Sequence, residues 1–304
     1  MKRSALRDLL SSILLASLPA AGCRTPCATQ TLTAPAVDST DAGCAIACTA
    51  AAAPLDPVII ESCHVTVGDG GTLIARCDYT DACGTGRRTE GLAEFSPEGA
   101  PHYGAAGYLA RAAALEAASI TAFRRLAVEL AEAGAPRDLV LRARRAAREE
   151  VRHARAVGAL ARDRGAEVPR LAITPRRQRT LRQVAIENAA EGCVRETYGA
   201  LVAAWQAARA ADTAVRSAWG AIADEEAGHA ELAWDVAAFL DTRLDADSRL
   251  AVAAARHQAA AGLAREVDVP VDEETVIALG VPGAGDARVL VAALDRRLWA
   301  SAPG

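Results

Sequence analysis

The segment EEVRH at residues 149–153 returns as EEAGH at residues 225–229, and EAASITAF at 116–123 is matched by EGCVRETY at 191–198. The two copies are separated by 75 or 76 residues, which indicates one structural unit used twice. Glu and His at positions i and i+3 project from one face of a helix, so both side chains can reach the same ligand. The repeat therefore predicts two similar helical hairpins that bring acidic and histidine side chains together.

Four long helices can be bounded by the residues that start and stop them. Pro136 suits a first helical turn and Asp212 an N-cap, while Gly134 and Gly165 suit helix ends. The connections within each pair of helices are very short, so we expect two antiparallel hairpins joined by a longer crossover. The predicted helices cover 104–133, 136–165, 180–211 and 212–240, with further helix at 247–266 and 286–299 inside a C-terminal extension, 242–304.

Each predicted helix carries acidic side chains within an otherwise apolar stripe. Burying an ionised carboxylate without a partner is costly, and these stripes offer no Lys or Arg, so the carboxylates need cations. Glutamate and histidine together provide oxygen and imidazole ligands, which suit iron or manganese better than a metal that prefers thiolates. The predicted metal ligands are Glu116, Glu150, His153, Glu191, Glu226 and His229.

One Glu from each of two helices, with Glu-x-x-His from each of the other two, resembles the ligand pattern of the ferritin-like di-iron carboxylate superfamily. The segment ENAAEGCVRET at 187–197 is also similar to uncharacterised exported ferritin-like lipoproteins of bacteria. The resemblance covers residues 104–241 and implies a mainly α, ferritin-like four-helix bundle. It also implies two iron ions, with manganese as an alternative, bridged by Glu150 and Glu226. One ion would be held by Glu116, Glu150 and His153, and the other by Glu191, Glu226 and His229.

Several residues near these ligands are candidates for supporting roles. Glu187, one turn before Glu191, is an extra ligand, a proton carrier or a half-exposed side chain, and Tyr198 is a redox relay or a core aromatic. Glu196 lies about 140° around an α-helix from Glu191, so we expect it in the outer shell or in solvent. We further expect Glu149 and Glu225 to be solvated, Cys193 to be a small buried hydrophobe, and His102 and His257 to lie at the surface.

The chain begins like an export signal, in which a basic start precedes an apolar run over 9–21. This run is too short to span a membrane. It ends AAGC at 20–23, which resembles a bacterial lipobox and predicts lipidation of Cys23, with an ordinary signal peptide over 1–23 as the alternative. We therefore expect an exported, cell-envelope protein, periplasmic or attached to the outer membrane by its N-terminal lipid.

Six cysteines crowd into a short stretch, which is typical of a small disulfide-held module in an oxidising compartment. Residues 24–57 are rich in Ala, Thr and Pro and predict a flexible linker. Over 58–100, β-rich runs flank the turn sequence GDGG at 68–71, and Cys63 and Cys77 can join the two arms of the resulting hairpin. The cysteines, whose pairing the sequence leaves open, are Cys27, Cys44, Cys48, Cys63, Cys77 and Cys83.

The composition and the metal motif together limit the classes of function that the sequence supports. The net charge is −4 and no basic stripe is present, so we expect no binding to nucleic acid. The leading expectation is a di-iron oxidoreductase of ferroxidase or peroxide-scavenging type, reacting with dioxygen or hydrogen peroxide and using an unknown electron donor. The alternatives are iron sequestration without turnover, an oxygenase acting on an organic substrate, and a non-enzymatic scaffold. The sequence does not decide whether the chain forms an oligomer.

Overall fold

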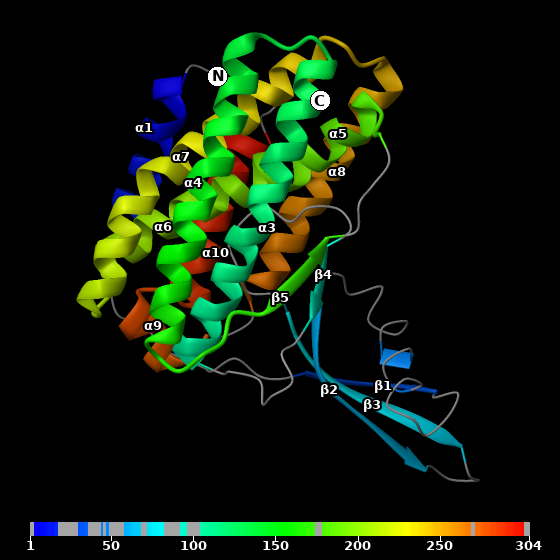
Figure 1. Ribbon diagram of the computed structural model, residues 1–304, viewed down its shortest axis with the longest axis vertical. Coiled ribbons are helices and arrows are strands. Elements are labelled where there is room, and N and C mark those ends of the chain that lie inside the picture. The colour runs from blue at the N-terminus through cyan, green and yellow to red at the C-terminus, as the bar shows by residue number, and fades with distance from the viewer. Residues whose placement is uncertain are drawn as a thin grey trace. The chain divides into compact units, whose positions relative to one another are not determined.

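A computed structural model divides the chain into two compact units, Pro26–Cys83 and a larger one that joins Met1–Thr25 to Gly84–Gly304. The chain is mostly helical, with a small antiparallel sheet in the smaller unit (Figure 1). The structure describes residues 3–17, 30–35, 44, 47–48, 58–67, 72–81, 92–95, 104–173, 178–268 and 271–300.

The smaller unit contains three antiparallel strands in the order β1 (Gln30–Pro35), β3 (Leu73–Asp81) and β2 (Val58–Val67). The predicted hairpin is confirmed, because β2 pairs with β3 on either side of residues 68–71. The predicted flexible linker over 24–57 is wrong in part. It contains β1, which pairs along β3 from Gln30 to Pro35, and it also supplies two disulfide cysteines.

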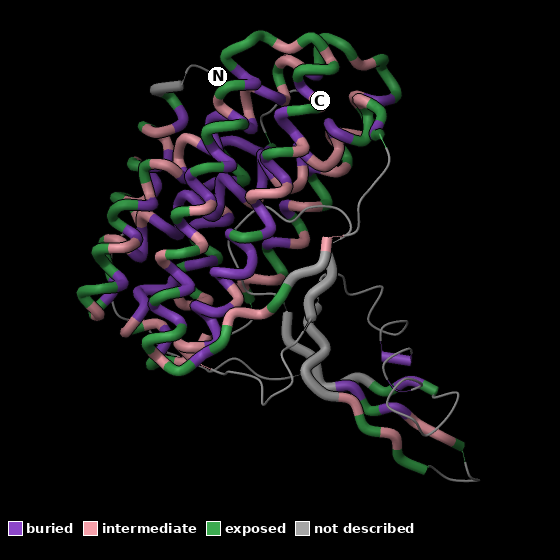
Figure 2. The backbone as a smooth tube through the Cα atoms, viewed as in Figure 1, coloured by how far each residue is buried: buried purple, intermediate pink, exposed green. Residues whose placement is uncertain are grey.

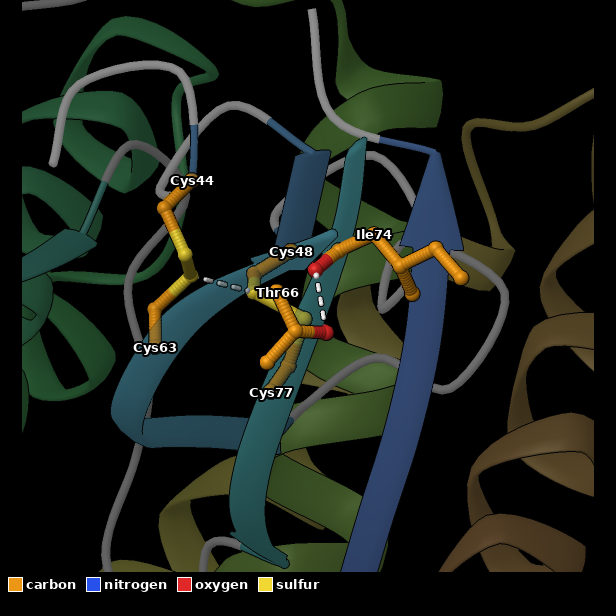
Figure 3. The surroundings of a disulfide bond; sticks show 6 residues. All are labelled: Cys44, Cys48, Cys63, Thr66, Ile74 and Cys77. Carbon is orange, nitrogen blue, oxygen red and sulfur yellow. Dashed lines mark hydrogen bonds between the residues drawn. A yellow bond between two sulfur atoms is a disulfide. The ribbon is translucent and has the colours of Figure 1, made fainter. Parts of the chain in front are cut away.

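Two disulfides hold this sheet, Cys44–Cys63 and Cys48–Cys77 (Figure 3). Cys63 and Cys77 are direct neighbours across β2 and β3. Of the pairings that the sequence left open, a bond between these two is not formed, because each is bonded to a cysteine that precedes β2. The four sulfur-bearing side chains pack together with Ala34 and Ala75, so covalent links replace the larger apolar core that so small a unit lacks. Cys23, Cys27 and Cys83 lie outside the described residues.

The larger unit is built on a first hairpin of α3 (Gly104–Glu132) and α4 (Arg137–Arg162). Both helices agree with the predicted ranges to within a few residues. The connection turns at Gly134, whose φ of 68° lies in the left-handed region that glycine adopts at little cost.

The second hairpin pairs α7 (Thr213–Asp241) with a helix interrupted in its middle. Its first part, α5 (Leu181–Glu187), starts with a capping box in which Thr180 and Gln183 satisfy each other's backbone N–H groups. A π-helical segment, η3 (Asn188–Glu196), follows, and α6 (Thr197–Arg209) completes the helix. Asp212 caps α7 as predicted, but η3 was not predicted.

Helices from both ends of the chain pack on the second hairpin. They are α1 (Arg3–Ala16), α8 (Ala246–Glu266), α9 (Glu273–Leu279), α10 (Ala284–Leu294) and the short π-segment η4 (Asp295–Trp299). Leu6, Leu10 and Ile13 of α1, in the predicted export signal, are buried in one apolar cluster with Trp205 and Leu290. A further two-stranded ribbon, β4 (Leu92–Phe95) with β5 (Arg170–Ile173), was not predicted, and neither was α9.

The buried residues of the long helices lie on the sides that face one another (Figure 2). Among the described residues, no single helix is long and apolar enough to cross a membrane. Only the pair Glu273–Leu279 and Ala284–Trp299, bent by 62°, reaches the required length and composition together.

Candidate metal centre

A polar layer crosses the two hairpins between two apolar clusters, which we call the Trp219 cluster and the Phe123 cluster after one residue of each. Glu116 of α3, Glu150 of α4 and Glu226 of α7 are all buried in this layer. On α3, Glu116 lies between Ala113 of the Trp219 cluster and Phe123 of the Phe123 cluster. On α4, Glu150 lies between Val157 of the first and Ala147 of the second, and on α7, Glu226 lies between Ile222 and Leu232 in the same way. The same order of cluster, glutamate, cluster on each helix places the three carboxylates at one height.

Four buried side chains converge in this layer. One ligand atom from each of Glu150, His153, Glu226 and His229 lies within 4.8 Å of the others. His153 Nδ1 is 2.9 Å from Glu226 Oε1, and His229 Nδ1 is 3.1 Å from Glu150 Oε1. Glu116 joins them, with Oε2 3.7 Å from His153 Nδ1. The structure thus brings together five of the six predicted ligands.

Each histidine faces the carboxylates of the opposite hairpin as well as its own. His229 Nδ1 lies 3.5 Å from Glu226 Oε1 on its own helix, and His153 Nδ1 lies 3.7 Å from Glu150 Oε2 on its own helix. The Phe123 ring covers the other side of His229, with the ring centroids 5.0 Å apart. Packing therefore fixes which ring nitrogen points inward.

The electrostatics of the cluster favour bound positive charge. Burial by itself would lower the pKa of both histidines, but the carboxylates outweigh it: the charge of Glu226 raises the pKa of His229, and the contact with Glu116 raises that of His153. Burial, followed by the charge of Glu150, raises the pKa of Glu116 well above its usual range. A site that draws protons to buried histidines also attracts metal cations, because protons and metal ions compete for the same atoms.

Several atoms of the cluster fit a metal and not a hydrogen-bond network. A polar network inside a protein is stable when each member is satisfied, and buried orphan atoms are rare in native proteins. The short contact between His153 Nδ1 and Glu226 Oε1 is not aligned as a hydrogen bond. The four inward atoms that make no hydrogen bond to described residues are Glu150 Oε2, His153 Nδ1, Glu226 Oε1 and His229 Nδ1. These residues can hold a metal ion.

Two further glutamates orient the histidines from outside. Glu149 Oε2 lies 3.1 Å from His229 Nε2, and Glu225 Oε2 lies 2.9 Å from His153 Nε2. Burial would raise the pKa of Glu149, but its bonds to His229 and Arg145 lower it to about 2, so it stays ionised. The expectation that both glutamates are solvated is wrong for Glu149, which is buried, and Glu225 is partly buried. The doubled Glu before each x-x-His was the sequence signal for this role.

On the interrupted helix the structure buries a different glutamate from the predicted one. Glu196 is 1% exposed and both its carboxylate oxygens are inaccessible to solvent. The Glu191 side chain is 17% exposed and lies with Oε1 3.6 Å from Arg195 Nε, so it is not brought into the cluster. The prediction assumed 3.6 residues per turn throughout. The wider i to i+5 turns of η3 change which residues face inward.

The position of Glu196 along its helix matches the polar layer. Ala185 belongs to the Phe123 cluster and Ala203 to the Trp219 cluster, and Glu196 lies between them. Glu196 precedes Ala203 by two α-helical turns, and residues seven apart share a helix face. Glu196 is therefore a buried carboxylate on the stretch of this helix that passes from the Phe123 cluster to the Trp219 cluster.

Glu187 is occupied by an ion pair away from the cluster. The buried guanidinium of Arg179 contacts Glu187 and also makes a two-bonded pair with Glu129 of α3, with both N···O distances at 2.7 Å. Arg179 therefore links the start of the second hairpin to α3, and its charge compensates that of the largely buried Glu187. Because this carboxylate is paired with Arg179, the structure agrees better with a partly exposed Glu187 than with Glu187 as a metal ligand.

The remaining supporting candidates have apolar or surface positions. Tyr198 is buried among apolar side chains that include Leu10 of α1 and Leu290 of α10, which fits a core aromatic. Cys193 is buried, as predicted, and it forms no disulfide. His257 is exposed, and His102 lies outside the described residues.

A cavity of about 320 Å³ reaches the centre from the outer side of α4 and α7. Glu149, Glu225 and His229 line its inner end. At its rim Arg7 of α1 is paired with Asp224 and with Glu231, the latter at 2.7 Å. The cavity thus borders the histidine side of the cluster.

No protein-family model, no characterised protein and no solved structure matches the chain.

Proposed function

We propose that the larger unit is a ferritin-like four-helix bundle with a dinuclear metal centre, and that the protein is an oxidoreductase of the cell envelope. The observation that carries this proposal is the set of four buried, inward-facing Glu and His atoms without hydrogen bonds, contributed in pairs by α4 and α7. Buried polar atoms without hydrogen bonds are rare in native proteins, and four of them from ligand-type side chains within one cluster support a bound cation.

The repeat assigns the ligands in two matching halves. Glu150 and Glu226 face both histidines, so they are suited to bridge two ions. Glu116 completes the half that contains His153. We assign Glu196 to the other half, with His229, because it is the buried glutamate of the interrupted helix. Oxygen and imidazole donors of this kind suit iron, with manganese as the alternative.

The described residues supply binding, orientation and exclusion of water. Glu149 and Glu225 contact the outer ring nitrogens, so when a metal ion displaces the inner protons of His229 and His153, the remaining N–H groups have acceptors and the inner nitrogens can act as ligands. The apolar clusters on either side keep bulk water from the centre. Two redox-active ions would supply electrons for the reduction of dioxygen or hydrogen peroxide, with an electron donor still to be identified.

The proposal includes the location of the protein in the cell envelope. The two disulfides are typical of an oxidising environment. Together with the export signal they support a cell-envelope location, with Cys23 as the site of the lipid anchor. Cleavage before Cys23 would remove α1 and with it Arg7 from the rim of the cavity, so the processed chain would present Asp224 and Glu231 to incoming cations.

Anaerobic loading of metal-free protein tests the centre and its activity separately. Titration with ferrous iron, followed by elemental analysis, should give close to two ions per chain. Stopped-flow mixing with dioxygen or hydrogen peroxide should then oxidise the iron faster than free ferrous iron. Less than about half an ion per chain would overturn the centre. Two ions without accelerated oxidation would overturn the oxidoreductase and leave a binding protein.

A further inference from the structure

The last helical segment of the chain contributes one hydrogen bond to the π-helix. Trp299 Nε1 donates to the backbone carbonyl of Cys193 at 2.9 Å, and the bond is buried. In an α-helix the N–H of Thr197, four residues on, would bond that carbonyl. Here the Thr197 N–H bonds Val194 O instead. The indole therefore supplies a donor to a carbonyl that has lost its α-helical partner.

This bond lies at the point where the helix returns from π to α geometry. η3 ends at Glu196 and α6 begins at Thr197. If the segment relaxed to α-helical turns, the residues on one side of Cys193 would rotate relative to those on the other, and Glu196 would turn away from the polar layer. The side chain of Thr197 is also held, because Trp234 Nε1 donates to its hydroxyl at 3.2 Å.

The surroundings of Trp299 hold its ring firmly in place. Trp299 is fully buried, and Leu294 and Leu298 of the same C-terminal stretch are buried beside it. All three belong to one apolar cluster with Val194 and Tyr198, which flank the carbonyl that the indole bonds. The extension thus presents a rigid donor to one chosen carbonyl of η3.

We propose that Trp299 is a positioning residue: its indole N–H holds η3 in the wide-turn register and so keeps Glu196 in the metal layer. The link to metal rests on the proposed function, whereas the link to the register of η3 does not. The C-terminal extension is then part of the metal centre, although none of its residues lies in the Glu and His cluster.

The test compares Trp299→Phe with a matched control, Trp219→Phe. Both tryptophans are buried, but Trp219 Nε1 makes no hydrogen bond to described residues, so its replacement removes ring volume and no such bond. Two readouts need no metal. Hydrogen exchange, followed by mass spectrometry of peptides covering 188–198, reports the opening of η3. Alkylation of Cys193, read on its own peptide, reports the same event through a buried thiol that is in no disulfide.

Losing this buried hydrogen bond should raise both rates in Trp299→Phe roughly tenfold over the wild type, with little change in Trp219→Phe. In metal-loaded protein, Trp299→Phe should weaken one of two bound Co²⁺ ions about tenfold or more and alter its visible spectrum. If Trp299→Phe does not fold, site-specific replacement of Trp299 by benzothienylalanine removes the donor with nearly the same ring shape.

The outcomes separate the two claims. Equal rates in both phenylalanine variants, or no change in either, would overturn the proposal, because packing alone would then explain Trp299. Faster opening of η3 with unchanged binding of both cobalt ions would overturn the link to Glu196. If the wild-type chain binds no metal, the proposed function fails, and the exchange and alkylation rates still decide whether Trp299 holds the register.

Discussion

Glu149 Oε2 lies 3.1 Å from His229 Nε2, so a buried carboxylate of the first hairpin holds a histidine of the second. Glu225 holds His153 in the reverse direction at 2.9 Å. Each hairpin therefore orients the metal-facing nitrogen of its partner, and neither hairpin forms a complete centre alone.

Replacing Glu149 with Gln should weaken metal binding without unfolding the protein. The amide keeps the shape of the side chain but loses the charge that fixes the His229 ring, and such outer partners typically contribute 10- to 100-fold in affinity. Chelator competition with Co²⁺ measures the loss. Glu132→Gln, at the exposed end of α3, is the control and should bind as the wild type does. Equal affinity in all three proteins would mean that Glu149 does not support the centre.

Gly280→Ala should destabilise the larger unit strongly. Gly280 has φ 65°, and a Cβ there would lie 2.3 Å from the backbone nitrogen of Ala210. Left-handed geometry alone costs a non-glycine residue about 1–2 kcal/mol, and the clash with backbone adds to it. We expect the free energy of unfolding to fall by at least about 2 kcal/mol in urea titrations.

The matched substitution is Gly220→Ala, at an exposed position inside α7 where an added Cβ meets nothing within 4 Å. Alanine should stabilise the helix there by about 0.5–1 kcal/mol. Similar effects of the two substitutions would contradict the close approach of Gly280 to the turn between α6 and α7.

Asp212→Ala should remove a helix cap and make the free energy of unfolding less dependent on pH in the acid range. Asp212 Oδ1 accepts from the N–H groups of Ala214 and Val215 at 2.8 and 3.1 Å, and loss of such a cap costs about 1 kcal/mol. The bond from Val215, with the nearby charge of Arg164, lowers the pKa of Asp212 below its usual 3.8. The charged form is therefore the stabilising one. Its contribution is complete above the unfolded-state pKa and is lost as the pH falls through the lower folded-state pKa.

Unfolding of Asp212→Ala and the wild type, compared between pH 7 and pH 2.5, should show a difference that shrinks below about pH 4. Asp212→Asn keeps a capping oxygen and should show a smaller, nearly pH-independent difference. A constant difference for the alanine variant would contradict the role of the charge.

The sequence was informative wherever local signals and the repeat agreed. Gly134, Pro136 and Asp212 marked the ends of the long helices, and the paired Glu-x-x-His motifs identified the four residues at the centre of the buried cluster. The sequence could not show where α-helical turns widen, because η3 depends on contacts such as that with Trp299, more than a hundred residues away in the chain. The strand β1 was missed for a related reason: its short sequence mixes Thr with Gln, Ala and Pro, and pairing along β3 holds it in place.

Glu196→Gln and Glu191→Gln should differ sharply in metal content. Glu196 is buried on the helix face that passes between the two apolar clusters, whereas Glu191 is partly exposed beside Arg195. The amide of glutamine is a poorer ligand than a carboxylate, so Glu196→Gln should lose one of two ions and Glu191→Gln should keep both. Elemental analysis after anaerobic loading counts the ions, and the visible spectrum of the cobalt protein shows which coordination sphere has changed. Loss of metal from Glu191→Gln with two ions retained in Glu196→Gln would show that η3 relaxes to α-helical turns when metal binds.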